Sequence, residues 1–395
     1  MNVLERMEAI GAQERIDHFN ELQKLPFEDK KVLAISRINE FLWECRRRGL
    51  NTHVSVGGLD SITLYMFINY HPNTSTLRKL IPGGHCPGIS ATYLEDKSIG
   101  KIHRAFGIES LRPVRDENGK PYTKQRILQE FGFPVLSKET AAKIELLQNP
   151  TERNKTVRHA IITGETGEYG GYRTGTRMQL SKKWLVKFGG YENDNEGVNY
   201  GVPDFKVSSK CCYYLKERPC DIWAKDHHSV PFLGLMASEH GRREKSLKVN
   251  GCNYFGNTTI RSAPFATFLR QDLLELAQEM DYYYQYEGVK EQILNEGIEA
   301  GRLKPGYEMP DSIVPTIYGD IASLLDGELY TTKAQRTGCS MCGFGIHLEK
   351  RPHRFDLLKE RNPKEWDYWM YHCCVDENGN EFGWAKVLDY IGVEY

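Results

Sequence analysis

The chain lacks three features that would narrow its class at once: an excess of one charge, a long apolar run and an internal repeat. Its formal net charge is −1 over 395 residues, so any contact with nucleic acid must come from a local patch. No apolar run approaches the roughly 20 residues that span a bilayer. The first residues are charged and helical in pattern, unlike a secretory signal. We therefore expect a cytoplasmic protein without membrane contact.

Cysteine is present in quantity, with ten residues. Without a signal sequence, reduced thiols or metal ligands are expected rather than disulfides. Four cysteines form two unlike pairs, Cys211-Cys212 and Cys339-x-x-Cys342. A Cys-x-x-Cys turn places two thiolates so that both can bind the same metal site. A second pair from a distant segment can supply the other two of four soft ligands. Four thiolates suit an iron–sulfur cluster or zinc, and not magnesium or calcium.

The adjacent pair distinguishes between these metals. Neighbouring cysteines in an extended segment point in divergent directions, so binding one ion with both would strain the backbone. A cluster, whose irons lie apart, accommodates them more easily, which favours iron–sulfur over a single zinc ion. Buried free thiols are the third alternative. A further tandem pair, Cys373-Cys374, has no context that assigns it a role.

The hydrophobic pattern predicts an α/β protein. Helices are expected up to about residue 50, followed by a buried strand at 52–56, a glycine turn and an apolar helix at 62–68. This order opens a parallel α/β unit. The other expected elements are strands at 89–94, 159–163 and 231–237, helices at 99–106 and 265–280, an irregular stretch at 164–201 and a helical insertion at 282–330.

The turn Gly57-Gly58-Leu59-Asp60-Ser61 is suited to bind phosphate. Glycines let the backbone approach an anion, and the start of the following helix offers free N–H groups and a positive dipole end. Asp60 can position a magnesium ion on a pyrophosphate, and Ser61 can donate to a phosphate oxygen. The alternative is a plain strand-to-helix turn with an Asp-Ser cap.

With this turn, the chain resembles the phosphoadenylylsulfate-reductase-like branch of the PP-loop adenine-nucleotide superfamily. The family signature is Ser-Gly-Gly-x-Asp-Ser, usually with Lys at x; here Val56 stands at the Ser position and Leu59 at the Lys position. The departure removes a hydroxyl donor and a cation, which puts fast pyrophosphate cleavage in doubt. The resemblance covers roughly residues 50–280 and 331–395. Its further matches lie at 131–139, 210–219, 234–243, 262–274 and 338–364, the last being closest to phage and plasmid proteins of the branch.

The resemblance implies a fold, a domain order and a set of site residues. The fold would be a PP-loop parallel sheet flanked by helices, with a helical N-terminal extension (1–50), a nucleotide-binding domain (51–280), a helical insertion (281–331) and a C-terminal cysteine-containing segment (332–395). A [4Fe–4S] cluster would be held by Cys211, Cys212, Cys339 and Cys342. The nucleotide, ATP or an adenylylsulfate, would bind with Mg²⁺ at Ser55, Gly57, Gly58, Asp60, Ser61 and Glu239. Asp60, Arg242 and Arg243 would act in catalysis.

Two chemistries use such a scaffold. A reductase releases sulfite from adenylylsulfate and needs a nucleophilic cysteine, which the family places in a Glu-Cys-Gly-Leu-His tail that this chain lacks. An ATP-dependent sulfur transferase adenylates an acceptor and replaces the adenylate with sulfur from a donor such as a cysteine desulfurase. Nucleic acid is one such acceptor, as in DNA phosphorothioation. The basic stretch 351–361 is consistent with a nucleic-acid contact, but a solvated helix face is the commoner explanation of such a stretch. Sulfur transfer is preferred; a nucleotide-binding protein without catalysis is the third expectation.

Overall fold

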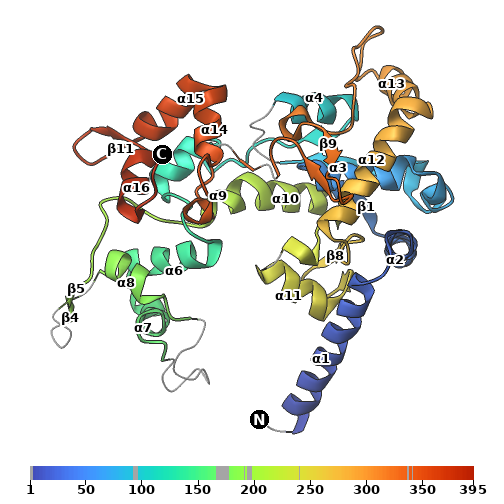
Figure 1. The fold of residues 1–395 in the computed structure, drawn as a ribbon. Helices are drawn as coiled ribbons and strands as arrows, with labels where there is room; N and C mark the ends of the chain where they lie inside the picture. The colour runs from blue at the N-terminus through green and yellow to red at the C-terminus, as the bar shows by residue number, and fades with distance from the viewer. Residues whose placement is uncertain are drawn as a thin grey trace. The chain divides into compact units, whose positions relative to one another are not determined.

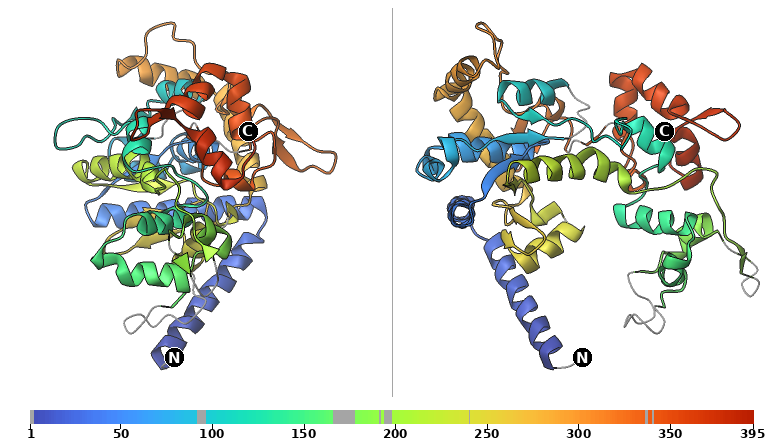
Figure 2. Two further views of the ribbon diagram at one scale, coloured as in Figure 1. Left: turned by 90° about the vertical axis from the view of Figure 1, so that its left-hand side faces the viewer. Right: turned by 180° about the vertical axis from the view of Figure 1, so that it is seen from behind.

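The computed structural model describes residues 3–91, 97–165, 178–190, 192–193, 198–239, 241–335, 338–339 and 341–395 (Figures 1 and 2). The chain divides into two compact units, each assembled from two separate stretches. Unit 1 comprises Met1–Arg112 and Pro219–Gly338, and unit 2 comprises Pro113–Arg218 and Cys339–Tyr395. Among the described helices, none is both long and apolar enough to cross a membrane.

A six-stranded sheet forms the centre of unit 1, in the order β3-β2-β1-β6-β8-β7. All neighbouring strands are parallel except β7, which runs antiparallel to β8 at one edge. The α/β class and the mostly parallel sheet predicted from the sequence are therefore confirmed. The strands are β1 (Asn51–Ser55), β2 (Gly88–Ser90), β3 (Glu109–Ser110), β6 (Ser229–Leu233), β7 (Asn253–Phe255) and β8 (Ile260–Ser262).

Helices cover both faces of this sheet. On the face of Val54 and Phe232, one apolar core joins the sheet to α2, α3, α4 and α12, with Phe41 of α2 packed edge-on against Phe232 at 5.0 Å. On the opposite face, Trp223 of α10 packs against His53. The helices are α1 (Val3–Gln23), α2 (Phe27–Arg47), α3 (Leu59–Tyr70), α4 (Lys97–Ala105), α10 (Arg218–Asp226), α11 (Gly241–Asn250), α12 (Arg270–Tyr286) and α13 (Val289–Glu299).

Unit 2 is mainly helical and surrounds its own core, which includes Phe133, Trp369 and Trp384. Cys211 and Cys212 lie in helix α9 and not in the extended segment assumed from the sequence, and Tyr213–Glu217 continues this helix as a π-helical turn. The elements of unit 2 are α5 (Lys124–Glu130), α6 (Lys138–Gln148), α7 (Lys155–Thr163), α8 (Lys182–Phe188), β4 (Glu192–Asn193), β5 (Val198–Asn199), α9 (Lys210–Cys212), α14 (Arg354–Arg361), α15 (Pro363–Asp367), β11 (Cys374–Val375), β12 (Glu381–Phe382) and α16 (Trp384–Ile391).

The structure corrects three of the predicted elements. Residues 159–163 are not a strand but the end of helix α7, which a left-handed Gly164 terminates. A short apolar run alone does not distinguish helix from strand. The stretch 164–201, predicted as irregular, contains α8, although residues 166–177, 191 and 194–197 lie outside the described part.

The third correction concerns the predicted helical insertion at 282–330. Helix α12 extends through Tyr286 and α13 follows it, but beyond Glu299 the chain is largely non-helical. It ends in a hairpin of β9 (Ile321–Ser323) and β10 (Leu329–Thr331). Proline and glycine residues at 301, 305, 306, 310 and 315 break the helix periodicity here.

Two histidines of unit 1 predict a pH dependence of stability. Burial lowers the pKa of both His53 and His103 to about 4, with His227 adding to the effect at His53. The unfolded chain therefore binds more protons between pH 6.5 and 4, and stability falls as the pH decreases through this window. By pH 5 each histidine should cost about 2 kcal/mol of unfolding free energy. Urea unfolding at pH 7.5 and 5 checks this: His53→Gln should reduce the difference, and an unchanged difference would contradict it.

Candidate functional site

The predicted phosphate turn lies at the carboxyl end of β1, where α3 begins at Leu59. From β1 the chain crosses through α3 to β2 on one side, while β6 lies on the other side. This is a topological switch point, and open parallel sheets bind ligands in the crevice outside it. The loop after β6 reaches the same place: a Cβ on Gly234 would lie 3.0 Å from the carbonyl group of Asp60.

Hydrogen bonds within the protein already engage part of the turn. The Gly57 N–H donates to Ser61 Oγ at 2.7 Å, and Ser61 Oγ lies 3.1 Å from the Gly58 carbonyl oxygen. The Leu59 N–H donates to the hydroxyl of Tyr318 at 3.1 Å. Ser61 therefore bonds within its own turn, but α3 begins without a side-chain cap at its N-cap residue Gly58, unlike the Asp-Ser cap considered as the alternative. A phosphate group needs other donors here, or it must displace these two acceptors.

Asp60 forms an ion pair that the sequence did not predict. Arg270, the first residue of α12, places its Nη1 atom 2.9 Å from Asp60 Oδ1. The same guanidinium donates from Nη2 to the carbonyl oxygen of Gln335 at 3.1 Å. Both charged side chains are 31% exposed, so solvent or a ligand can reach the pair. A cation therefore lies at the turn, although it comes from a distant helix.

The other predicted nucleotide residues lie at the same end of the sheet. Ser55 ends β1 and is half-buried, and Glu239 ends a short 3₁₀ turn that follows β6. Arg242 and Arg243 lie in the first turn of α11, but their side chains fall outside the described part of the structure. Ser90 ends β2 at this edge, and its buried hydroxyl has no hydrogen-bond partner among the described residues.

His103 of α4 contacts the backbone of the phosphate turn. Its Nε2 atom lies 3.0 Å from the Gly57 carbonyl oxygen. Burial lowers the pKa of His103 to about 4, although its bond to Gly57 opposes that shift. The ring is therefore neutral at physiological pH and donates its Nε2 proton to the carbonyl group. It orients the turn without adding positive charge.

The four predicted cysteines all belong to unit 2. The segment 133–136 forms backbone hydrogen bonds with the chain next to both cysteine pairs. Phe133 bonds through its backbone to Lys206 and Ser208, just before the first cysteine pair, and Leu136 accepts from the Gly345 N–H, just after the second. Gly132, at φ +114°, allows the Lys206 backbone to approach closely. The two cysteine segments therefore dock on opposite ends of one short stretch of chain.

The thiols of the two pairs lie near one another. Burial raises the pKa of Cys211 to about 12, opposed by Lys124, while Cys339, Cys212 and Cys342 raise it further. Cys342 donates its N–H to the Cys339 carbonyl oxygen at 3.2 Å, which closes the Cys-x-x-Cys turn. No cluster of His, Cys, Asp or Glu side chains fit to hold a metal ion is found within the described ranges.

Three lysines face these thiols. Burial lowers the pKa of Lys216, but Cys339 and Cys212 outweigh that and raise it overall. Lys138 hydrogen-bonds to Glu217 at 3.0 Å; burial lowers its pKa, but Cys212 and Glu217 outweigh that and raise it. Lys124 is only 3% exposed, lies 4.6 Å above the ring of Trp369 and opposes the rise in the pKa of Cys211. Lys124 and Lys138 lie far from either cysteine pair in the sequence.

Four thiols beside lysines are the donor types expected for the predicted iron–sulfur cluster. Zinc bound at about 2.3 Å by each of four sulfurs would need the thiolates in a tight tetrahedron. An iron–sulfur cluster takes four thiolates that are spaced more widely. Such a cluster carries negative charge, which lysines around the thiols would offset. Cys211, Cys212, Cys339 and Cys342 are therefore the residues that would hold it.

Two further sequence features are explained by local pairing. In the basic stretch 351–361, Arg351 pairs with Asp356 at 2.8 Å, and Arg354 pairs with Glu349. His353 is buried. The helix-face explanation of this stretch is therefore favoured over a nucleic-acid contact.

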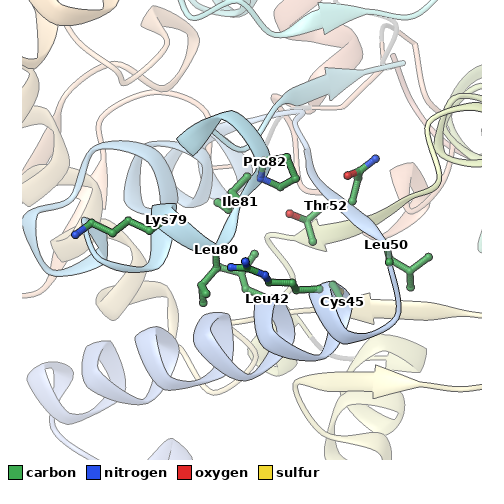
Figure 3. Close-up of a pocket in the computed structure, with 11 residues that line it drawn as sticks. Leu42, Cys45, Leu50, Thr52, Lys79, Leu80, Ile81 and Pro82 are labelled. Atoms are coloured by element: carbon green, nitrogen blue, oxygen red, sulfur yellow. The ribbon is translucent and has the colours of Figure 1, made fainter.

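The arginine run that ends α2 is likewise paired in part, because Arg47 and Arg48 both bond to Glu44 at 2.6 Å. Next to this run, a pocket of about 340 Å³ opens at the amino end of β1, away from the phosphate turn (Figure 3). Its labelled lining comes from α2, β1 and the turn before β2: Leu42, Cys45, Leu50, Thr52, Lys79, Leu80, Ile81 and Pro82.

Comparisons of the chain with protein-family models, with curated proteins and with solved structures found no match. The geometry of the two sites is therefore the basis for any assignment of function.

Proposed function

We propose that this protein is an iron–sulfur enzyme of the PP-loop type that uses ATP to transfer sulfur to an acceptor. The observation that carries the proposal is the convergence of Cys211, Cys212, Cys339 and Cys342, which come from two distant segments, beside three lysines. Four thiols facing cations are expected at a thiolate-bound cluster and are costly in an ordinary core. The glycine turn at the switch point of a parallel sheet supports the nucleotide half of the proposal.

In the nucleotide half, an acceptor oxygen attacks the α-phosphorus of ATP, a P–O bond forms and pyrophosphate leaves. Asp60 would hold a magnesium ion, which would offset the negative charge of the phosphates, and free N–H groups of the turn would orient them. A persulfide from a donor such as a cysteine desulfurase then displaces AMP, which leaves with the acceptor oxygen. An external thiol reduces the resulting acceptor–donor disulfide, so that the sulfur stays on the acceptor. A nucleic-acid backbone is one acceptor of this class.

In the cysteine half, a bound cluster supplies a site that can hold or pass on sulfide. The residues of this chain would hold the cluster and fix the positions of its cysteine ligands. Met341, 1% exposed, anchors the Cys-x-x-Cys turn in the core, and Trp384 fills the space beside Gly343. Lys138 and Lys216 supply positive charge beside Cys212 and Cys339. Burial raises the pKa of Cys212, and the two lysines oppose that shift without reversing it.

Reductive release of sulfite is the second candidate, and the surroundings of Cys373 and Cys374 weigh against it. A reductase needs an accessible nucleophilic thiolate. Cys373 and Cys374 are 0% and 2% exposed, and their sulfur atoms lie 4.0 Å apart. The hydrogen bond from Cys373, together with burial, raises the pKa of Cys374. Neither thiol therefore suits attack on a sulfur substrate.

A nucleotide-binding protein without catalysis is the third candidate. It is favoured by the two turn amides that already donate to Ser61 and Tyr318. The same candidate is favoured by Leu59, which is apolar and fully buried at the turn.

A paired assay separates the three candidates. Purified protein is incubated anaerobically with ATP, Mg²⁺, a desulfurase, free cysteine, a thiol reductant and DNA, and separately with adenylylsulfate and a thiol. We expect pyrophosphate and AMP release in the first mixture, dependent on acceptor, and no sulfite in the second. Sulfite release would instead establish the reductase. Nucleotide binding without any turnover, with an intact cluster, would establish the third candidate.

A further inference from the structure

The phosphate turn has no cation of its own. Between Asn51 and Tyr70 the sequence contains neither lysine nor arginine, and its one charged side chain at pH 7 is the carboxylate of Asp60. His103 beneath the turn is neutral because burial lowers its pKa to about 4. An incoming triphosphate would therefore meet a negative charge at the very turn that has to bind it.

Arg270 supplies the missing charge in space. Its guanidinium lies 2.9 Å from Asp60, directly at the turn, and the bond to the Gln335 carbonyl oxygen fixes its orientation. It remains 31% exposed, so one edge of the guanidinium can still be reached by a ligand. A guanidinium is always charged and binds phosphate oxygens through parallel N–H groups, which makes it a strong partner for a polyphosphate.

We infer that Arg270 is the phosphate-binding cation of this site, and that it exchanges Asp60 for the nucleotide. The inference rests on the proposed nucleotide function. Without Mg²⁺, Asp60 and the phosphates compete for the same guanidinium. With Mg²⁺, the metal ion takes the carboxylate of Asp60, and Arg270 turns to the phosphate oxygens. The pair therefore couples metal binding to nucleotide binding, and Arg270 replaces the turn lysine by a residue from α12.

Isothermal titration of the full chain tests this, with ATP, AMP, adenosine and inorganic tripolyphosphate as ligands. Arg270→Gln should weaken ATP and tripolyphosphate binding in Mg²⁺ by about tenfold or more, as expected for loss of a charge-assisted contact. Adenosine binding should not change. Arg270→Lys keeps the positive charge but lacks the parallel N–H groups of the guanidinium, so it should show an intermediate loss of ATP affinity. The matched control is Arg46→Gln, an exposed arginine before the opposite end of β1, which should bind as the wild type does.

Asp60→Asn provides the sharpest readout, because the exchange predicts opposite effects in two buffers. In Mg²⁺ it should weaken ATP binding, since the metal ligand is lost. In EDTA it should strengthen ATP binding several-fold, since Arg270 no longer pairs with a carboxylate. A purely structural role for the pair would give weaker binding in both buffers. Circular dichroism melting of each variant identifies any loss of fold, and Arg270→Lys covers the case in which the glutamine variant unfolds.

The outcomes separate this inference from the proposed function. If the wild type binds ATP with Mg²⁺ but Arg270→Gln binds it equally well, the inference is wrong and the nucleotide function stands. An equal loss for adenosine, or weaker ATP binding by Asp60→Asn in EDTA, also overturns it. If the wild type binds neither ATP nor tripolyphosphate, both the proposed function and the inference are wrong.

Discussion

Replacing Cys339 with alanine is expected to remove iron from the anaerobically purified protein, from about four irons per chain to fewer than about one. Cys339 is buried and interacts electrostatically with both Cys211 and Lys216. Three remaining thiols would leave one iron without its protein ligand. The loss is measured as iron and acid-labile sulfide per chain, together with the visible absorption of the cluster.

The control for this variant is Cys373→Ala in the same unit. Cys373 is fully buried like Cys339, but its sulfur bonds to the Trp369 carbonyl oxygen instead of facing the other pair. It should keep its iron even if it loses some stability. Iron retained in Cys339→Ala, or lost equally in both variants, would contradict the assignment of the four ligands. Cys212→Ala should match Cys339→Ala, since each pair contributes to the same centre.

The second large effect is expected in the core of unit 1, at the buried ion pair between Lys30 and Asp272. Lys30 Nζ lies 2.7 Å from Asp272 Oδ2, and both residues are less than 10% exposed. The same oxygen accepts the Leu269 N–H at 2.6 Å, which caps the start of α12. Lys30→Ala leaves a carboxylate buried with one partner fewer, and it should lower the unfolding free energy by roughly 3–5 kcal/mol.

Urea unfolding followed by circular dichroism measures this loss, with Lys24→Ala as control. Lys24 also pairs with a carboxylate, Glu21, at 2.8 Å, but its side chain is 70% exposed. Exposed pairs of this kind contribute less than about 1 kcal/mol. Equal effects of the two variants would show that burial does not set the strength of these pairs. The ion pair between Lys30 and Asp272 also matters for the phosphate turn, because Asp272 caps the start of α12 and Arg270 is the first residue of that helix.

The sequence predicted those parts of the fold whose signals are local. The strand, glycine turn and apolar helix that become β1 and α3 follow one another within twenty residues, and each has its own periodicity. The mostly parallel sheet followed from this unit. The end of helix α7 was predicted as a strand because three apolar residues in a row satisfy both a helix and a strand. The feature that decides between them, the left-handed conformation of Gly164, is not visible in the sequence.

The site was predictable where residue type alone limits the chemistry. Two cysteine pairs predict soft metal ligands, and the structure places all four cysteines in unit 2. The metal itself stays a prediction, since no metal-binding group is found among the described residues. Arg270 and Tyr318 could not be predicted, because they reach the turn from 210 and 259 residues away. The sequence around Lys124 does not show whether this lysine is buried or lies on the surface. The assignments of nucleotide, metal and catalytic residues stay predictions until they are measured.

The central claim is that the four cysteines hold an iron–sulfur cluster, and its most direct test is the metal content and spectrum of the wild-type protein. The protein is purified without oxygen and analysed for iron, zinc and sulfide, then reduced and examined by electron paramagnetic resonance at low temperature. We predict brown protein with about four irons and four sulfides per chain and, on reduction, the signal of a [4Fe–4S] centre. Colourless protein that contains one zinc ion, or no metal, would contradict the account.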